Sequence, residues 1–269
     1  MTDRKTPVDS ICHLLREDAE LAQALPPGRR KLAEATCTAR SLHVHRGRWK
    51  EPAADVPDAA AVLVLDGLLL RRVSVNGRAG AELLGRGDVI RPWEENSEVK
   101  LPEATAWRAL ETTRLAVLDE HAVERMADYP EVMRRLLDRS LERSRRLTVN
   151  MAIVHHPRVD IRLQMLFWHL AERWGRVRNG LTFLPLGLTH SVLADLIAAQ
   201  RPTVSTTLSD MVTRGIVRRA QDGWLLLAPP PEVGPGSEEP DPATARREPA
   251  ETGNASRLSL HERLAASPG

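Results

Sequence analysis

Residues 189–214 constrain the fold of this chain more than any other stretch. They predict two short helices joined by a turn at Ala198-Ala199-Gln200. Thr189 supplies a side-chain oxygen that can cap the first helix. Pro202 stands in the first turn of the second helix, where its missing N–H costs little. Two helices of this length with so short a turn are typical of a helix-turn-helix motif.

The two faces of the second predicted helix differ in composition. Its buried stripe is expected to consist of Val204, Leu208, Met211 and Val212. The opposite face presents hydroxyls, an amide and an arginine, with no carboxylate before Asp210. Because surface helices usually carry both signs of charge, this composition favours contact with a polyanion. We interpret the motif as a DNA-binding one.

The residues that follow the motif predict a wing. Gly215 is expected to end the second helix, and residues 216–219 and 224–227 predict two strands around a hairpin turn at Asp222-Gly223. A helix-turn-helix followed by such a hairpin is a winged helix, and the alternative is an ordinary helical hairpin in a core. The candidate DNA contacts in the motif and the wing are Thr189, Gln200, Arg201, Thr203, Ser205, Thr206, Arg218 and Arg219.

Charge is distributed unevenly along the chain. The whole sequence has a formal net charge of +2, but residues 134–219 contain 15 arginines and 6 acidic residues, a balance of +9. The cationic segment therefore contains the predicted helix-turn-helix, as a phosphate-binding surface requires. The sequence shows neither a run of 18 apolar residues nor a signal-peptide pattern, so we expect a cytoplasmic protein without membrane contact.

The hydrophobic period changes within the first 120 residues. Residues 1–34 predict helix, with a break at Pro26-Pro27-Gly28. From about Thr38, short alternating segments are separated by turns such as Asp66-Gly67 and Asn76-Gly77, which indicates a small β-roll or barrel. The expected strands cover residues 41–45, 61–65, 68–73, 80–84, 89–90, 104–110 and 114–118.

The helical period returns at Asp119. Tyr129-Pro130 opens a long predicted helix that runs to a break at His155-His156-Pro157, and a further helix is expected over residues 159–174. The apolar stripe of the long helix favours a dimer seam, and the alternative is a surface helix that packs only on its own roll. The apolar positions of this stripe include Val132, Met133, Leu136, Leu137, Leu141, Leu147, Met151 and Val154.

The segment beyond Pro229 is rich in proline and glutamate and poor in apolar residues, so we expect it to be disordered. The predicted fold class is α+β, with an N-terminal β-roll, a long dimerisation helix and a C-terminal winged helix-turn-helix. The expected divisions are N-terminal helices (1–36), a β-roll sensor-like domain (37–120), a long dimerisation helix with a hinge (121–156), a winged-helix DNA-binding domain (157–228) and a tail (229–269).

This plan resembles that of the CRP/FNR transcription regulators. The resemblance rests most specifically on the run RPTVS at 201–205, followed by Leu208, and on GRGDVI at 85–90, which is similar to the family's Gly-Asp turn between roll strands. It implies a roll like a cyclic-nucleotide-binding domain and a homodimer paired through the long helices. Two recognition helices would then enter successive major grooves, about 34 Å apart. Arg201 matches the family's recognition helix, but Pro202 and Thr206 do not, so the DNA sequence bound should differ from the family's best-known one.

Two departures from the family pattern lead us to expect that cyclic AMP is not the effector. Family members that bind the nucleotide hold its ribose with a Gly-Glu pair, where this chain has Arg91-Pro92-Trp93. Ala104 stands where their phosphate-binding arginine is expected, which removes a bidentate, charge-assisted partner. The candidate pocket residues for another effector are Arg91, Trp93, Thr105 and Trp107, and the alternative is that they are core and rim of a roll without a ligand.

Two function hypotheses follow. The first is a homodimeric, sequence-specific regulator of transcription that binds double-stranded DNA, with control by an effector in the roll left open. The second is a constitutive DNA-binding or architectural factor whose roll is an interaction or dimerisation scaffold. We expect no enzyme activity, cofactor or metal, because the sequence shows no nucleophile–base arrangement or metal-ligand spacing, and two cysteines cannot supply the four thiolates of an iron–sulfur cluster.

Overall fold

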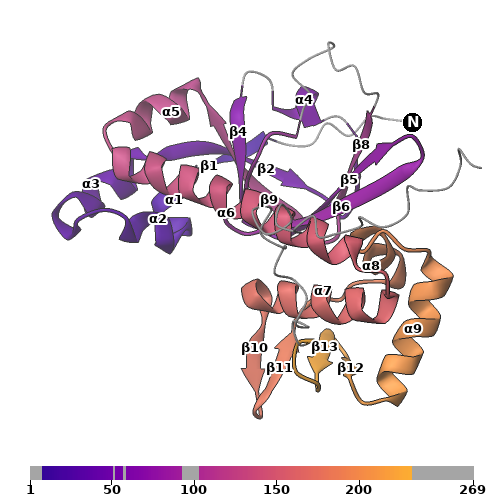
Figure 1. Ribbon diagram of the computed structural model, residues 1–269. Coiled ribbons are helices and arrows are strands. Elements are labelled where there is room, and N and C mark those ends of the chain that lie inside the picture. Colours follow the sequence, from indigo (N-terminus) through magenta and orange to yellow (C-terminus); the bar gives the residue numbers. More distant parts are fainter. Residues whose placement is uncertain (1–7, 51, 57–58, 93–102, 232–269) are drawn as a thin grey trace, which may run out of the picture. The chain divides into compact units, whose positions relative to one another are not determined.

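The computed structural model describes residues 8–50, 52–56, 59–92 and 103–231. The described chain has the predicted α+β fold, with a β-rich N-terminal part, one long helix and a C-terminal helix-turn-helix (Figure 1). The predicted tail beyond residue 231 and the candidate pocket residue Trp93 lie outside the described residues. Within the described ranges, no helix combines the length and apolar character needed to cross a membrane.

Two antiparallel sheets form the roll. One has the strand order β1-β2-β9-β4-β7 and the other β3-β8-β5-β6. Side chains from both sheets, such as Leu69, Trp107 and Leu115, form a shared core cluster, so the two sheets face each other across it. The strands are β1 (Val8–His13), β2 (Thr38–Val44), β3 (Gly47–Trp49), β4 (Ala59–Asp66), β5 (Leu68–Val75), β6 (Arg78–Gly85), β7 (Val89–Ile90), β8 (Glu103–Ala109) and β9 (Thr113–Asp119).

The predicted turns of the roll are confirmed. Asn76 and Gly77 both have positive φ and connect β5 to β6 as a two-residue hairpin. Gly67 has φ +94° and lies so close to Thr113 that a Cβ would come within 2.6 Å of the Thr113 Cα. Only glycine satisfies both conditions at position 67.

Small helices cover the other face of the first sheet. Their buried side chains share a cluster with strand residues such as Leu63 and Leu118, which alternate with the inward-facing residues of the same strands. Asp18 and Asp119 cap α2 and α5 by accepting hydrogen bonds from the backbone N–H of Leu21 and Ala122. The helices before the long one are α1 (Leu14–Glu17), α2 (Ala19–Gln23), α3 (Pro27–Thr36), α4 (Pro52–Asp55) and α5 (Glu120–Ala127).

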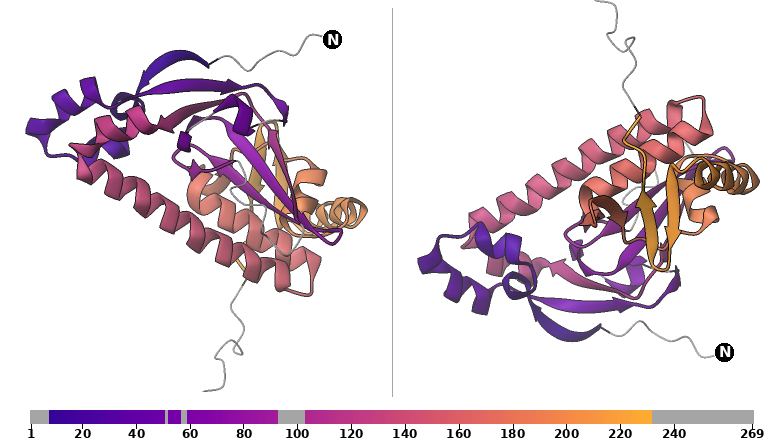
Figure 2. Two further views of the ribbon diagram at one scale, coloured as in Figure 1. Left: turned by 90° about the horizontal axis from the view of Figure 1, so that it is seen from above. Right: turned by 90° about the horizontal axis from the view of Figure 1, so that it is seen from below.

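The long helix α6 (Pro130–His155) begins and ends where predicted, and α7 (Val159–Trp174) follows it. Helix α6 contacts α2, α5, β7 and α7. It is the long helix that runs beside the strands in both views of Figure 2. The winged helix-turn-helix comprises α8 (His190–Leu196), α9 (Arg201–Thr213), β12 (Val217–Ala220) and β13 (Gly223–Leu226). Its sheet also includes the unpredicted hairpin β10 (Arg176–Arg178) and β11 (Leu181–Leu184), in the order β10-β11-β13-β12.

Three expectations need correction. Helix throughout residues 1–34 is wrong for Val8–His13, which form β1 because their backbone pairs with β2 at the sheet edge. Val212 is 44% exposed, since it lies about 100° around α9 from the buried Met211. The apolar stripe of α6 is not one seam, because Val132 and Leu136 are buried against the small helices of the same chain whereas Leu137 and Leu141 are exposed.

Candidate nucleic-acid interface

The first helix of the helix-turn-helix is fixed at its start by its cap. Thr189 accepts a hydrogen bond from the backbone N–H of Val192 at 3.3 Å, as predicted. The connection to α9 includes Ala198, whose φ of +51° turns the chain sharply. His190 and Ser205 then join the two helices through a 2.9 Å hydrogen bond between Nδ1 and Oγ.

One face of α9 is buried and the other is exposed. Val204, Leu208 and Met211 are almost completely buried, at spacings of four and three residues. On the exposed face, the hydroxyls of Thr206 and Thr207 donate to carbonyls one turn earlier. With these donors used locally, the face presents methyl groups, oxygen lone pairs and the Arg201 guanidinium.

The wing contributes two arginines with different surroundings. Arg218 is exposed. Arg219 lies over the Trp224 ring, 4.6 Å from its centroid, and donates to the Leu188 carbonyl at 3.3 Å. Arg219 is therefore held by packing and a hydrogen bond, while Arg218 can reach outward.

A groove of about 780 Å³ brings several of the predicted contacts together. It is bordered by the start of α8, by both polar and apolar side chains of α9, and by the wing. Of the eight predicted DNA contacts, Thr189, Arg201, Ser205 and Arg219 line it, while Gln200, Thr203, Thr206 and Arg218 do not. The groove is also lined by four polar residues that were not predicted as DNA contacts, namely His190, Ser191, Ser209 and Thr213.

The roll supports the helix-turn-helix directly. Leu68, Leu70 and Leu83 of the β5–β6 hairpin belong to the same hydrophobic cluster as residues of α7, α8 and α9. Trp174 packs on Gly85, where a Cβ would come within 3.2 Å of the indole. These contacts join the DNA-binding elements to one face of the roll.

Polar contacts reinforce this junction. Arg72 of β5 forms an ion pair with Asp195 of α8 at 3.4 Å. Arg173 of α7 forms one with Asp88, in the turn between β6 and β7, at 2.7 Å. Both pairs link the roll to a helix of the DNA-binding region.

The face of α6 that lies on the roll carries arginines at spacings of four and three residues. The buried Arg139 guanidinium donates to both carboxylate oxygens of Asp18, at 2.6 and 2.8 Å. Arg143 binds Glu82 in the same two-pronged way, at 2.6 and 2.9 Å. These arginines were not predicted to contact the roll, because an arginine on a long helix is ordinarily exposed to solvent.

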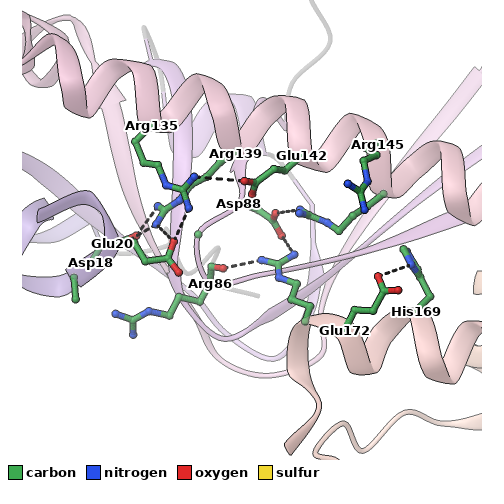
Figure 3. A pocket seen from close by; sticks show the side chains of 14 residues that line it. Asp18, Glu20, Arg86, Asp88, Arg135, Arg139, Glu142, Arg145, His169 and Glu172 are labelled. Atoms are coloured by element: carbon green, nitrogen blue, oxygen red, sulfur yellow. Dashed lines mark hydrogen bonds and ion pairs between the residues drawn. The ribbon is translucent and has the colours of Figure 1, made fainter. Parts of the chain in front are cut away.

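Asp88 lies where α6, α7 and the roll meet. Its carboxylate is 2% exposed and accepts from the Gly85 backbone N–H and from both Arg146 and Arg173. Figure 3 shows Asp88, Arg139, Glu142 and Arg145 among the side chains that line a cavity of about 550 Å³. Burial lowers the pKa of Arg146, Asp88 opposes this effect and Arg173 adds to it, so the pKa lies below its ordinary value. Two guanidinium groups thus share one carboxylate.

Three of the four candidate pocket residues, Arg91, Thr105 and Trp107, lie within the described residues. Trp107 is buried in the roll core, where its ring meets that of Trp49 edge-on at 6.1 Å. Thr105 is half-buried two residues earlier on β8, and Arg91 is exposed. None of these three residues lines the groove beside α9 or the cavity beside Asp88.

Comparison with known protein families supports the helix-turn-helix directly. Residues 161–230 match the model of the Crp-like helix-turn-helix domain. A curated relative, the CRP-like cAMP-activated global transcriptional regulator of Mycobacterium tuberculosis (strain ATCC 25618 / H37Rv), is 30% identical over 118 residues. The match covers 44% of this chain and 53% of the relative, so the chain spans about half the length of that protein.

Solved structures support the fold. A cyclic nucleotide-binding domain containing protein from Listeria monocytogenes EGD-e superposes with a TM-score of 0.55 and 14% identity, over 70% of this chain and 89% of that one. CprK complexed with OCPA gives a TM-score of 0.53 and 12% identity, over 84% of this chain and 98% of that one. At this level of identity, the similarity concerns the arrangement of the elements.

Proposed function

We propose that this chain regulates transcription as a homodimer bound to specific sequences of double-stranded DNA. It joins a Crp-like helix-turn-helix domain to the fold of the CRP/FNR regulators and so belongs to that family. The observation that carries the proposal is the exposed face of α9. It presents Arg201 and hydroxyl-bearing residues beside the groove formed with α8 and the wing. Arginine can bind the acceptors of guanine in a two-pronged way, and threonine methyls can contact thymine.

The proposed dimer uses the exposed side of α6. Leu137, Leu141 and Met151 are each 60% exposed. With Ser144 and Thr148 between them, they follow spacings of four, three, four and three residues, which is the seam of a two-stranded coiled coil. A second copy of the chain, presenting the same stripe across a two-fold axis, would remove these leucines from water.

Control of the DNA-binding region is proposed to pass through Asp88. Because this carboxylate joins the roll turn to both α6 and α7, a change in the roll that moves the turn would move both helices. An effector that binds only one arrangement would shift the population of dimers able to bind DNA. Thr105 and Arg91 stay candidates for contact with such an effector, and we propose that it is not cyclic AMP.

The first test is selection of DNA from a random duplex library by the purified full-length chain without added ligand. We expect enrichment of a palindrome with half-sites about one helical turn apart. Arg201→Ala should weaken binding to the enriched site by about 1–3 kcal/mol and relax the preference at one base pair. Arg125→Ala, an exposed arginine on α5, is the matched control and should bind like the wild type. Binding that is weak and equal for all sequences would contradict the proposal.

A further inference from the structure

At the outer edge of the second sheet, two arginines occupy directly opposite positions on neighbouring strands. In the antiparallel β3–β8 pair, Arg48 lies directly across from Arg108, and both side chains are exposed. Like charges at directly opposite positions destabilise a sheet. Within residues 8–50, 52–56, 59–92 and 103–231, neither guanidinium forms a hydrogen bond, an ion pair or a ring contact.

Nothing on the two strands offsets this charge. Trp49 and Trp107 alternate with the arginines and point into the roll core, so the arginines point outward. The sole acidic residue of β3 and β8 is Glu103, five residues from Arg108, which is about 17 Å along an extended strand. Among the residues that the structure describes on these two strands, the positive charge of the arginines is therefore uncompensated, and it favours an anionic partner.

The edge adjoins the start of the helix-turn-helix. Arg108 and Arg46 line a cavity of about 420 Å³ together with Gly187, Leu188 and Thr189. Leu188 and Thr189 also line the groove beside α9. The arginine edge and the groove thus meet at the cap of α8.

The register of the sheet explains this adjacency. Arg108 lies across from Leu70 on β5, and Leu70 lies across from Leu83 on β6. The two leucines pack against the DNA-binding elements, so Arg108 continues the same face of the sheet beyond the part that those elements cover. A duplex seated on α9 and the α8 cap would pass next to this uncovered part.

We propose that Arg46, Arg48 and Arg108, the arginine edge of the roll, bind backbone phosphates of the DNA that flanks the segment contacted by α9. The inference rests on the proposed function and extends it, because it gives the roll a direct part in DNA binding. Arginine suits phosphate through its planar fork of donors, and phosphate contacts fix position without reading sequence. The edge therefore adds affinity and orientation and leaves base preference to α9.

The test compares two duplexes that contain the same site, selected from the random library by the full-length chain. The short duplex spans about 20 base pairs, and the long one carries about 10 further base pairs at each end. We expect Arg48→Ala combined with Arg108→Ala to bind the short duplex as the wild type does and to bind the long one about tenfold or more weakly. The slope of log affinity against log salt on the long duplex should become less steep by about 0.9 for each phosphate that the variant leaves unneutralised. The double lysine variant, Arg48→Lys with Arg108→Lys, should keep most of the long-duplex affinity.

The outcomes separate the two proposals. If the double alanine variant matches the wild type on both duplexes, the arginine edge does not bind flanking DNA, although the proposed function stands. An equal loss on both duplexes, or a change in base preference, would likewise overturn the flanking role. If the wild type binds neither duplex in preference to a scrambled one, both proposals fail. Arg125→Ala controls for the loss of one exposed positive charge elsewhere on the chain.

Discussion

Asp88 and Arg173 form a 2.7 Å ion pair that joins a turn of the roll to the helix leading into the helix-turn-helix. The carboxylate is almost fully buried, and the Arg173 guanidinium also donates to the backbone carbonyls of Gly85 and Arg86. Because the carboxylate is buried and both terminal nitrogens of the guanidinium have acceptors, this pair fixes geometry more strongly than an exposed one. The GRGD turn, which resembles a family turn in sequence, is thus also a link to α7.

Asp88→Asn should loosen the DNA-binding region from the roll. Removing the charge leaves Arg146 and Arg173 without their shared carboxylate, and we expect a loss of about 3 kcal/mol in the free energy of unfolding. Relative to the wild type, amide hydrogen exchange should speed up more in α7 and α9 than in the roll core. Glu172→Gln is the control, since this exposed carboxylate borders the same cavity, and it should change stability by less than about 0.5 kcal/mol. Uniformly faster exchange throughout the roll would show that Asp88 acts on the roll alone.

Asp18→Asn should destabilise the chain at neutral pH and do so less in acid. Burial raises the pKa of Asp18, but the hydrogen bonds and charge of Arg139 outweigh this and hold it below its ordinary value of 3.8. A lowered pKa in the folded state means that the stabilisation is complete above pH 4 or so and is lost as the pH falls through the folded value. Near pH 7, urea unfolding should show that the variant has lost about 3 kcal/mol in the free energy of unfolding. The loss should not be larger, because Glu20 still pairs with Arg139. The difference from the wild type should shrink below about pH 4, and a difference independent of pH down to pH 2 would contradict the ion-pair account.

Leu137→Glu combined with Leu141→Glu should give a folded monomer. Both leucines are already exposed in the single chain, so the glutamates cost little there, while four carboxylates would meet across the proposed seam. Sedimentation velocity would show the change from dimer to monomer, and circular dichroism would show that the helices remain. Leu32→Glu is the matched control, because this leucine of α3 is 65% exposed and lies off the seam. If the double variant remains a dimer, the seam lies elsewhere.

Gly223→Ala should disrupt the wing. A Cβ at this position would come within 2.0 Å of the Leu184 carbonyl oxygen, and this backbone atom cannot move without disturbing the β11–β13 pair. We expect a loss of at least about 2 kcal/mol in stability and weaker DNA binding than that of the wild type at the same folded fraction. Gly80→Ala, at a glycine with open space around its Cβ position, should be nearly neutral in both measurements.

The parts of the fold that the sequence predicted best are those with local signals. The caps, periodicity and breaks around α6, α7, α8 and α9 lie within a few residues of each helix end, so the bounds of these helices could be predicted closely. In contrast, the pairing of β1 and β3 depends on strands far away in the sequence. Ile11 illustrates the difficulty, because a residue placed in a helical pattern is in fact 70% exposed on an edge strand. The β10–β11 hairpin did carry a local signal, the Asn179-Gly180 turn with two positive φ angles, which was not used in the prediction.

The DNA-binding face of α9 could be predicted from local sequence, whereas the contacts of α6 with the roll could not. The hydroxyl-rich face of α9 follows from helical spacing alone, and the structure exposes it. Arg139, Arg143 and Arg146 carry no such local sign, since an arginine on a long helix is ordinarily solvated. Their role requires acidic partners from α2, β6 and the turn at Asp88, which only the tertiary fold brings together.

The leucines of the β5–β6 hairpin have a consequence for how the molecule can be divided. Leu68, Leu70 and Leu83 complete the hydrophobic core of a region whose family match begins only at residue 161. A fragment cut at that boundary would leave Leu166, Leu170 and Leu196 facing water, as a contiguous apolar patch prone to aggregation. The unit that can be transplanted onto another protein is therefore discontinuous in sequence, and a working chimera would have to carry the hairpin along with the DNA-binding helices.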